Sequence, residues 1–244
     1  MCTLTYLPKK EGFILTSSRD EVYSRPTTIP KRYTIFDQNV IFPKDEFKGG
    51  TWLVLGENRV ICLLNGSEKD FEIKEHYHES RGTLVLNHFK FQNSHSFFQD
   101  ESFENVAPFT MVIFSLKDEM IIQEISWNGS EKTMRFVNSA EPKIWSSTTL
   151  YSKDKREERK IWFSDFLKEN RTLTKKDLLN FHQKEHTEES ATNILMKRRD
   201  GKQTTSISQI NVNATEKSFL YHNLLDQTTT KILWTKEEMD SPSL

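Results

Sequence analysis

The chain predicts an α+β fold in which two antiparallel sheets are flanked by helices, and three observations lead to this prediction. Strand-like segments open and close the chain, while the segments with helical spacing lie in its middle. Neighbouring strand-like runs are joined by turns of only a few residues, which is typical of antiparallel hairpins. The regular alternation of strands and helices that builds a parallel dinucleotide-binding sheet does not occur.

The predicted strands are short runs of apolar and β-branched residues that end at Gly, Asn or charged turns. The first two, at 3–6 and 12–17, form a hairpin that places residue 2 beside the end of the second strand. Pro26 and Pro30 predict irregular structure from 19 to 30, because proline donates no backbone hydrogen bond. The later predicted strands span 51–55, 59–64, 109–116, 120–127, 132–137, 202–211, 218–223 and 231–234.

Helical spacing of apolar residues predicts helices at 80–91, 154–169 and 174–181. The last of these begins at Thr174, with Asp177 in its first turn. A length of 244 residues and the lack of a long linker favour one domain over 1–244, with a frayed tail at 237–244.

Charge and composition narrow the functional classes. The 34 basic and 35 acidic residues give a net charge of −1, so the basic surface of a nucleic-acid-binding protein is not expected. No apolar run reaches the roughly 18–20 residues of a membrane span. The N-terminus does not have the layout of a signal peptide, so we expect a cytoplasmic protein. Two cysteines are too few for a disulfide framework.

The second residue carries the first chemical signal. If the initiator methionine is removed, Cys2 carries both a thiol and a free α-amino group. An α-amine has a pKa of about 7.7–8.0, so it can act as a base toward the neighbouring thiol. Position alone is a weak signal, because most cysteines at residue 2 have no function.

A charged turn, Ser18-Arg19-Asp20-Glu21, follows the second predicted strand and would lie beside Cys2. A carboxylate near an N-terminal amine can orient it, and a guanidinium can hold a thiolate or a substrate carboxylate. We therefore expect a site centred on the N-terminus.

Three motifs in the first 65 residues have a shared order and spacing: the opening Met-Cys, Ser18-Arg19-Asp20-Glu21 with Tyr23-Ser24-Arg25-Pro26, and Gly49-Gly50-Thr51-Trp52-Leu53. In these motifs the chain resembles the NRDE family, that of the Transport and Golgi organization 2 proteins. Looser matches follow at Asn65, at Ser80-Arg81-Gly82 and at Ile144-Trp145-Ser146-Ser147-Thr148.

The resemblance implies a four-layer αββα fold like that of N-terminal-nucleophile hydrolases, whose cysteine members attack an amide carbonyl. Carried over by position, Cys2 would be the nucleophile and, through its α-amine, the base. Arg19 would support the thiolate and Asp20 would orient the amine. Asn65 would stabilise the oxyanion. The other expected binding residues are Ser18, Glu21, Arg25, Trp52, Thr148 and Gln203.

The chain departs from the family pattern at three places. Ser18 replaces the leading Asn of the motif. Ser147 and Thr148 supply hydroxyls where the family has an Asn amide, and Gln203 or Lys202 stands where a second Arg is expected. The first half of the expected site is therefore intact and the second half is altered.

Three functions remain open from the sequence. The first is a hydrolase that cleaves a small amide, thioester or ester through an acyl-cysteine. The second is a non-enzymatic carrier or chaperone for an apolar ligand such as haem or an acyl chain, because haem trafficking is associated with relatives of the family. The third is a structural or interaction domain with a vestigial site. The first two imply a small-molecule partner, and we expect no resident cofactor.

Other candidate residues have simpler interpretations. His182 and His186 have a spacing that can hold zinc, but we expect them at a solvated helix end. His76 and His78 lie in a polar stretch and are expected at the surface. Cys62 lies in an apolar strand and is expected to be an inert core residue, and the tryptophans are expected to serve packing.

Overall fold

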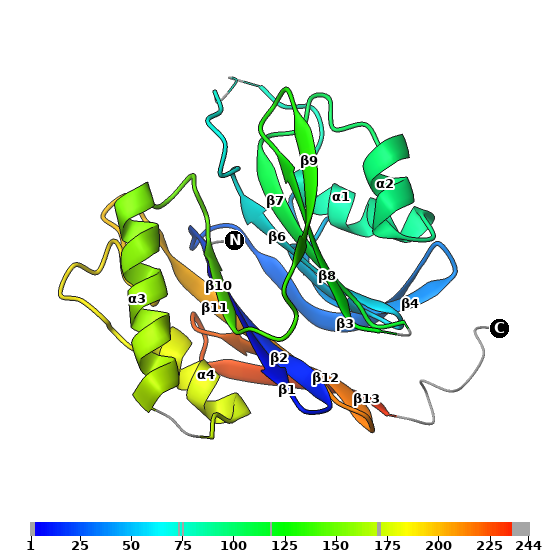
Figure 1. Ribbon diagram of the computed structural model, residues 1–244. Coiled ribbons are helices and arrows are strands. Elements are labelled where there is room, and N and C mark those ends of the chain that lie inside the picture. Colours follow the sequence, from blue (N-terminus) through cyan, green and yellow to red (C-terminus); the bar gives the residue numbers. More distant parts are fainter. Residues whose placement is uncertain (1–2, 73, 75, 118, 170–171, 236–244) are drawn as a thin grey trace. The chain divides into compact units, whose positions relative to one another are not determined.

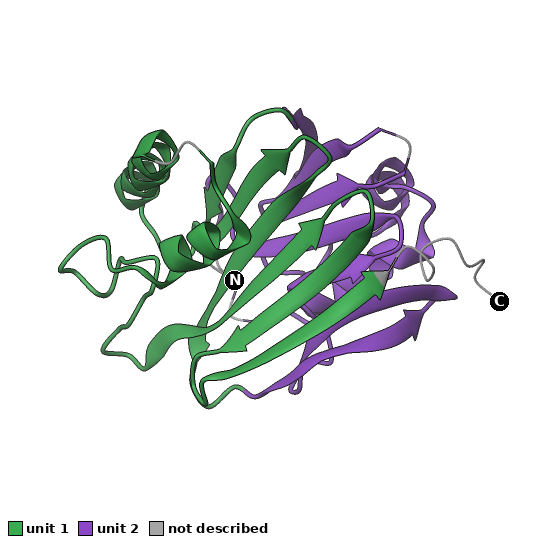
Figure 2. Cartoon of the chain, turned by 90° about the horizontal axis from the view of Figure 1, so that it is seen from below, with its two compact units in different colours: residues 1–25, 140–236 green, residues 26–139, 237–244 purple. Residues whose placement is uncertain are grey.

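The computed structural model describes residues 3–72, 74, 76–117, 119–169 and 172–235, and these residues form two compact units (Figure 2). The described residues of unit 1 lie within 3–25 and 140–235, and those of unit 2 lie within 26–139. Each unit is built on one antiparallel sheet. The chain therefore leaves unit 1 after two strands and returns to it at residue 140.

Unit 1 contains a six-stranded sheet with the order β10-β1-β2-β11-β12-β13. Helices α3 and α4 pack against β10, β2 and β11 of this sheet (Figure 1). The chain order thus places strands from both ends of the sequence side by side. The elements are β1 (Thr3–Lys9), β2 (Gly12–Val22), β10 (Lys143–Ser146), α3 (Lys153–Glu169), α4 (Lys175–Gln183), β11 (Lys202–Val212), β12 (Glu216–Asn223) and β13 (Thr228–Thr235).

Unit 2 contains a seven-stranded sheet in which every strand neighbours the next one in the chain, from β3 to β9. Short helices α1, η1 and α2 connect β6 to β7 (Figure 1). The elements are β3 (Thr27–Ile35), β4 (Gln38–Asp45), β5 (Leu53–Gly56), β6 (Arg59–Asn65), α1 (Arg81–Asn87), η1 (His88–Lys90), α2 (Ser94–Asp100), β7 (Phe109–Ser115), β8 (Ile121–Trp127) and β9 (Lys132–Val137).

The prediction of an α+β fold with two antiparallel sheets is confirmed, as are the predicted hairpins and the helices in the middle of the chain. Thr174 caps α4 as expected, since its side chain accepts a hydrogen bond from the Asp177 N–H in a capping box. The predicted tail at 237–244 lies outside the described residues.

The prediction of irregular structure from 19 to 30 is wrong. Strand β2 continues to Val22 and carries the Ser18-Arg19-Asp20-Glu21 motif, because it pairs with β1 on one side and β11 on the other. Pro30 lies within β3, where the pairing register shifts between Thr28 and Lys31. Because β3 is an edge strand, the missing proline N–H leaves no neighbouring strand unpaired.

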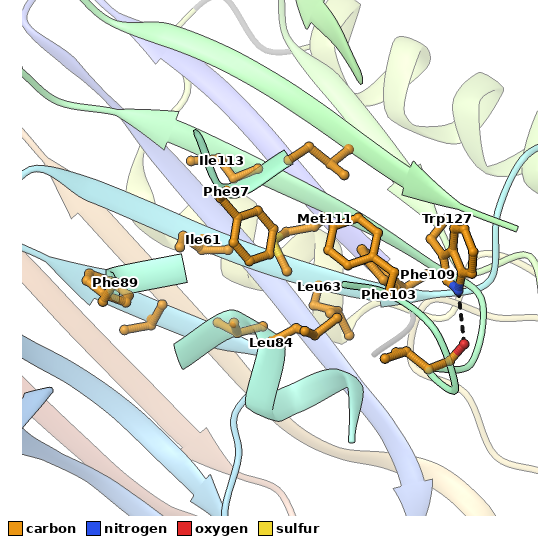
Figure 3. Packing of buried hydrophobic residues seen from close by; sticks show 14 of the residues in the cluster. Ile61, Leu63, Leu84, Phe89, Phe97, Phe103, Phe109, Met111, Ile113 and Trp127 are labelled. Carbon is orange, nitrogen blue, oxygen red and sulfur yellow. Dashed lines mark hydrogen bonds between the residues drawn. The ribbon is translucent and has the colours of Figure 1, made fainter. Parts of the chain in front are cut away.

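The core of unit 2 combines aliphatic side chains with a row of aromatic ones. Phe97, Phe103 and Phe109 are almost completely buried and contact one another in sequence, with ring centroids 5.5 and 5.1 Å apart (Figure 3). Trp127 packs on Phe103, and its Nε1–H donates to the Val106 carbonyl at 3.0 Å. Burial of Cys62 in β6 confirms its expected place in the core.

A close contact between two backbone segments explains part of the Gly49-Gly50-Thr51-Trp52-Leu53 motif. A Cβ built on Gly50 would lie 2.4 Å from the carbonyl carbon of Gly82, and the Thr51 N–H donates to the Gly82 carbonyl at 3.1 Å. The motif is therefore packed against Ser80-Arg81-Gly82 at the start of α1. Only a residue without a side chain fits at Gly50.

We predict that Gly50→Ala destabilises the protein by about 1–3 kcal/mol, because the added methyl group forces two backbone segments apart. Urea unfolding followed by tryptophan fluorescence measures the change. A Gly50→Ala protein with wild-type stability would show that this contact adjusts without cost.

Candidate functional site

The strand that follows the expected nucleophile begins in the interior of unit 1. Cys2 itself lies outside the described residues. Thr3 pairs with Ser18 of β2 on one side and with Ser146 of β10 on the other, and it is fully buried. Its Oγ1 accepts a hydrogen bond from Nη1 of Arg159 in α3 at 2.6 Å. Both the backbone and the side chain of Thr3 are therefore fixed.

Asp20 is a buried hub of hydrogen bonds, with only 4% of its surface exposed. Its Oδ2 accepts from the Tyr151 hydroxyl at 2.8 Å, and its Oδ1 accepts from Thr204 Oγ1 at 2.6 Å. Thr204 Oγ1 in turn accepts from the Met196 N–H at 2.8 Å. The carboxylate thus connects β2, β11 and the segment that follows β10.

Tyr151 links this hub to a fully buried cation. The guanidinium carbon of Arg159 lies 3.5 Å from the centroid of the Tyr151 ring, a close cation–π contact. Other guanidinium nitrogens of Arg159 donate to the carbonyls of Thr192 and Asn193. A chain of direct contacts therefore runs from Asp20 through Tyr151 and Arg159 to Thr3.

Arg19 lies on the opposite face of β2 from Asp20, because successive strand residues point to opposite faces. Its Nη1 donates to Thr205 Oγ1 at 3.2 Å, and the same hydroxyl donates back to the Arg19 carbonyl at 3.1 Å. This contact coincides with the register shift between Thr204 and Ser206. Burial raises the pKa of nearby Tyr221, and the positive charge of Arg19 opposes that rise.

Ser18 shares the α3–α4 face of β2 with Asp20 and is bonded to a histidine. Its Oγ lies 2.8 Å from Nδ1 of His182, and Thr5 Oγ1 lies 2.8 Å from the other ring nitrogen. His182 is fully buried, so the expectation of a solvated helix end is wrong for this residue. Burial lowers the pKa of His182 to about 3, with a further contribution from the Arg159 charge. The imidazole is therefore neutral at physiological pH.

Other expected binding residues lie at the end of β2 and after β10. Glu21 and Gln203 are half-buried and paired across β2 and β11. Glu21 Oε2 also forms an ion pair with Arg25 Nη1 at 3.4 Å. Thr148 Oγ1 is enclosed and makes no hydrogen bond within the described chain.

Asn65 and Trp52 belong to unit 2, whereas the other described site residues belong to unit 1. Asn65 ends β6, pairs with Phe109 of β7 and is half-buried. Trp52 is buried just before β5, and its carbonyl accepts from the Leu63 N–H at 2.9 Å. Each is thus held by the sheet of its own unit.

The site residues that the sequence did not single out are Tyr151, Arg159 and Thr204. Tyr151 and Thr204 lie in segments without a diagnostic motif, so sequence offered no signal for them. Arg159 could have been placed by its helix, because it lies four residues before the buried Phe163 and shares its face. The same spacing argument applies to His182, four residues after the buried Leu178.

The described residues contain no group of three or more His, Cys, Asp or Glu side chains arranged to hold a metal ion. Within the same part of the chain, no helix has both the length and the apolar character that a membrane crossing requires.

A family model described as Transport and Golgi organisation 2 matches residues 1–239. The chain belongs to this family. A search of the curated proteins finds no match. Among solved structures, penicillin V acylase from Agrobacterium tumefaciens is similar, with a TM-score of 0.57 and 10% sequence identity. The match covers 98% of this chain and 88% of the acylase, so this chain shares the fold of that acylase.

We predict that the stabilising effect of His182 is lost in acid. The unfolded imidazole takes up a proton near pH 6.5, whereas the folded one stays neutral down to about pH 3. The free energy of unfolding therefore falls as pH drops below 6.5. A His182→Gln variant has no imidazole to protonate and does not lose stability in this way. The difference between its free energy of unfolding and that of the wild type should therefore shrink by about 2–3 kcal/mol between pH 7 and pH 4.5.

Urea unfolding of both proteins across this pH range tests the prediction. His95→Gln, at an exposed position, is the matched control and should track the wild type throughout. If the difference in free energy of unfolding between the wild type and His182→Gln does not change with pH, His182 is not held neutral in the folded protein.

Proposed function

We propose that the protein is an N-terminal cysteine hydrolase that cleaves a small amide, thioester or ester through an acyl-cysteine. The observation that supports this proposal most is the fixed start of β1. Thr3, which directly follows Cys2, is buried, paired on both sides and bonded to Arg159. A nucleophile at the preceding residue would thus be attached to a rigid support, as preorganised catalysis requires.

In the proposed reaction, the α-amine of Cys2 takes the thiol proton and the sulfur attacks the substrate carbonyl. The amine then returns that proton to the leaving amine, alcohol or thiol, and a thioester to Cys2 remains. Water attacks this thioester with the amine again acting as base, which releases the carboxylic acid and restores the thiol. Each step conserves protons without a cofactor.

Arg19 and Asp20 have separate roles in this proposal. The proposal requires Cys2 to follow the alternation of β1, which would put its thiol on the face of β2 that carries Arg19. The Arg19 guanidinium would then support the thiolate. Asp20 would orient the amine, either directly or through the network of Tyr151 and Arg159 that holds Thr3.

The remaining residues are proposed to bind the substrate. Asn65 would donate to the oxyanion, an interaction that contributes about 2.7–4 kcal/mol in other enzymes. The enclosed Thr148 hydroxyl supplies a donor or acceptor where the family has an Asn amide. Ser18, whose hydroxyl is bonded to His182, has a positioning role rather than a binding one.

We predict that hydrolysis of 4-nitrophenyl esters or penicillin V depends on Cys2. Cys2→Ala should lower the rate by at least about 1,000-fold, because the nucleophile is removed. Cys62→Ala is the matched control, since Cys62 is buried in the core of unit 2 and should leave the rate unchanged. A continuous absorbance assay measures both variants.

Intact-mass analysis of the same protein shows whether Met1 has been removed. The mechanism needs a free α-amine, so Met1 must be absent from the mature chain. A retained Met1, or equal activity of the wild type and Cys2→Ala, would contradict the proposal. Haem titration of these proteins would then test the carrier hypothesis that the sequence left open.

A further inference from the structure

Unit 2 contains an open pocket of about 850 Å³ between the 3₁₀ helix η1 and the turns at one end of its sheet. Its apolar walls come mainly from Phe36, Phe89, Phe91 and Ile121. This volume lies in the range of small-molecule sites in proteins. The pocket contains none of the residues assigned to the hydrolytic site, so what it binds is a separate question.

The Arg59 guanidinium, which has no carboxylate partner among the described residues, lines this pocket. Nη1 of Arg59 donates to Nδ1 of His88 at 2.9 Å and to the Phe91 carbonyl at 3.1 Å, and Nη2 donates to the Gln92 carbonyl at 3.0 Å. No described carboxylate forms an ion pair with Arg59 in unit 2 or elsewhere. Burial accordingly lowers the pKa of this guanidinium, which is the expected cost of an uncompensated charge.

The donors of Arg59 are only partly used. Nε has no partner among the described atoms, and Nη2 has used one of its two N–H groups. Nε and Nη2 form one edge of the planar guanidinium, and the Nε donor on this edge has no partner among the described atoms. Two parallel donors on one edge match the two oxygens of a carboxylate.

The remaining charges of the pocket favour an anion. Among the described residues that line it, Lys90 and Lys117 add two cations and Glu119 adds a single carboxylate. His88 is neutral, because burial and the Arg59 charge lower its pKa to about 3. Since Arg59 donates to Nδ1, the proton of His88 lies on Nε2 and points to Ser94 Oγ at 3.2 Å. The described lining of the pocket therefore carries three cations and one anion.

Phe36 is held at the edge of the pocket at a conformational cost. It has a φ of 47°, a left-handed conformation that is unfavourable for a bulky residue, and 48% of its surface is exposed. The Lys90 ammonium lies 5.3 Å from its ring centroid. Asp37, the next residue in the turn, also has a positive φ of 60° but does not line the pocket. Positive φ at both positions is the ordinary geometry of the two-residue turn that joins β3 to β4, so it is the exposure of the Phe36 ring that makes it available to a ligand at the pocket edge.

We propose that this pocket binds an aromatic monocarboxylate, with the carboxylate on the Nε–Nη2 edge of Arg59 and the aromatic body between the phenylalanine rings. Phenylalanine faces and edges favour a flat aromatic partner over a flexible chain. The lysines add attraction for the anion, and the partly desolvated guanidinium gains a counterion that the described residues do not supply.

Isothermal titration calorimetry with 2-naphthoate tests the proposal. The neutral isostere 2-naphthamide should bind at least 10-fold more weakly, because it replaces a charge-assisted pair with neutral hydrogen bonds. Decanoate, which keeps the carboxylate but not the ring, should also bind more weakly than 2-naphthoate. Equal affinities for 2-naphthoate and 2-naphthamide would overturn the proposal, as would tighter binding of decanoate.

Two glycine substitutions locate the site without depending on Arg59, whose replacement endangers the fold around η1. Phe36→Gly removes the ring and relieves the positive φ, so it should fold at least as well as the wild type and bind 2-naphthoate at least 5-fold more weakly. Asp37→Gly relieves strain in the same turn and should bind normally. Cys2→Ala should also bind normally, which separates this site from the proposed hydrolase. Unchanged binding by Phe36→Gly would overturn the proposal.

Discussion

The buried carboxylate of Asp20 is the interaction on which the rest of unit 1 depends. Burying a charged group costs several kcal/mol unless hydrogen bonds replace the lost water. Tyr151 and Thr204 provide such bonds at 2.8 and 2.6 Å. Hydrogen bonds to charged groups contribute about 1.5–3 kcal/mol each. The two bonds therefore hold the side chains of Tyr151 and Thr204 in place as well as the carboxylate of Asp20.

The consequences of this constraint extend to the start of the chain. Tyr151, which donates to Asp20, lies with its ring centroid 3.5 Å from the guanidinium carbon of Arg159. Arg159 in turn donates to Thr3, the residue after Cys2. The Ser18-Arg19-Asp20-Glu21 motif thereby has two functions: one face of β2 supports the N-terminal strand, while the other presents Arg19. A turn, as expected from sequence, could not separate these functions by face.

Local patterns predicted much of this structure. Apolar runs and short polar turns identified most strands, the Thr174 and Asp177 pair identified the start of α4, and motif order identified the family. Prediction from the sequence failed where the local structure depends on pairing with distant parts of the chain. Polar residues at 18–22 form a strand only because β1 and β11 flank them, and β11 is some 180 residues away in the chain.

The candidate site shows the same division. Arg19 and Asp20 could be selected from a local motif, whereas Tyr151 and Thr204 become partners of Asp20 only through the fold. His182 illustrates the opposite error, because charged neighbours suggested a solvated helix end. Its position on the apolar face of α4 was the better guide, because the face of a helix on which a residue lies determines its burial more than the charges of its neighbours in sequence do.

The central claim is that this framework presents Cys2 as a nucleophile, and trapping the covalent intermediate tests it most directly. The protein is quenched in acid during turnover of a phenyl thioester, digested, and analysed by mass spectrometry. The account predicts an acyl group on the N-terminal peptide at Cys2 that hydroxylamine removes, as expected for a thioester. An N-terminal peptide that stays unmodified, or an acyl group found only on Cys62, would contradict the account.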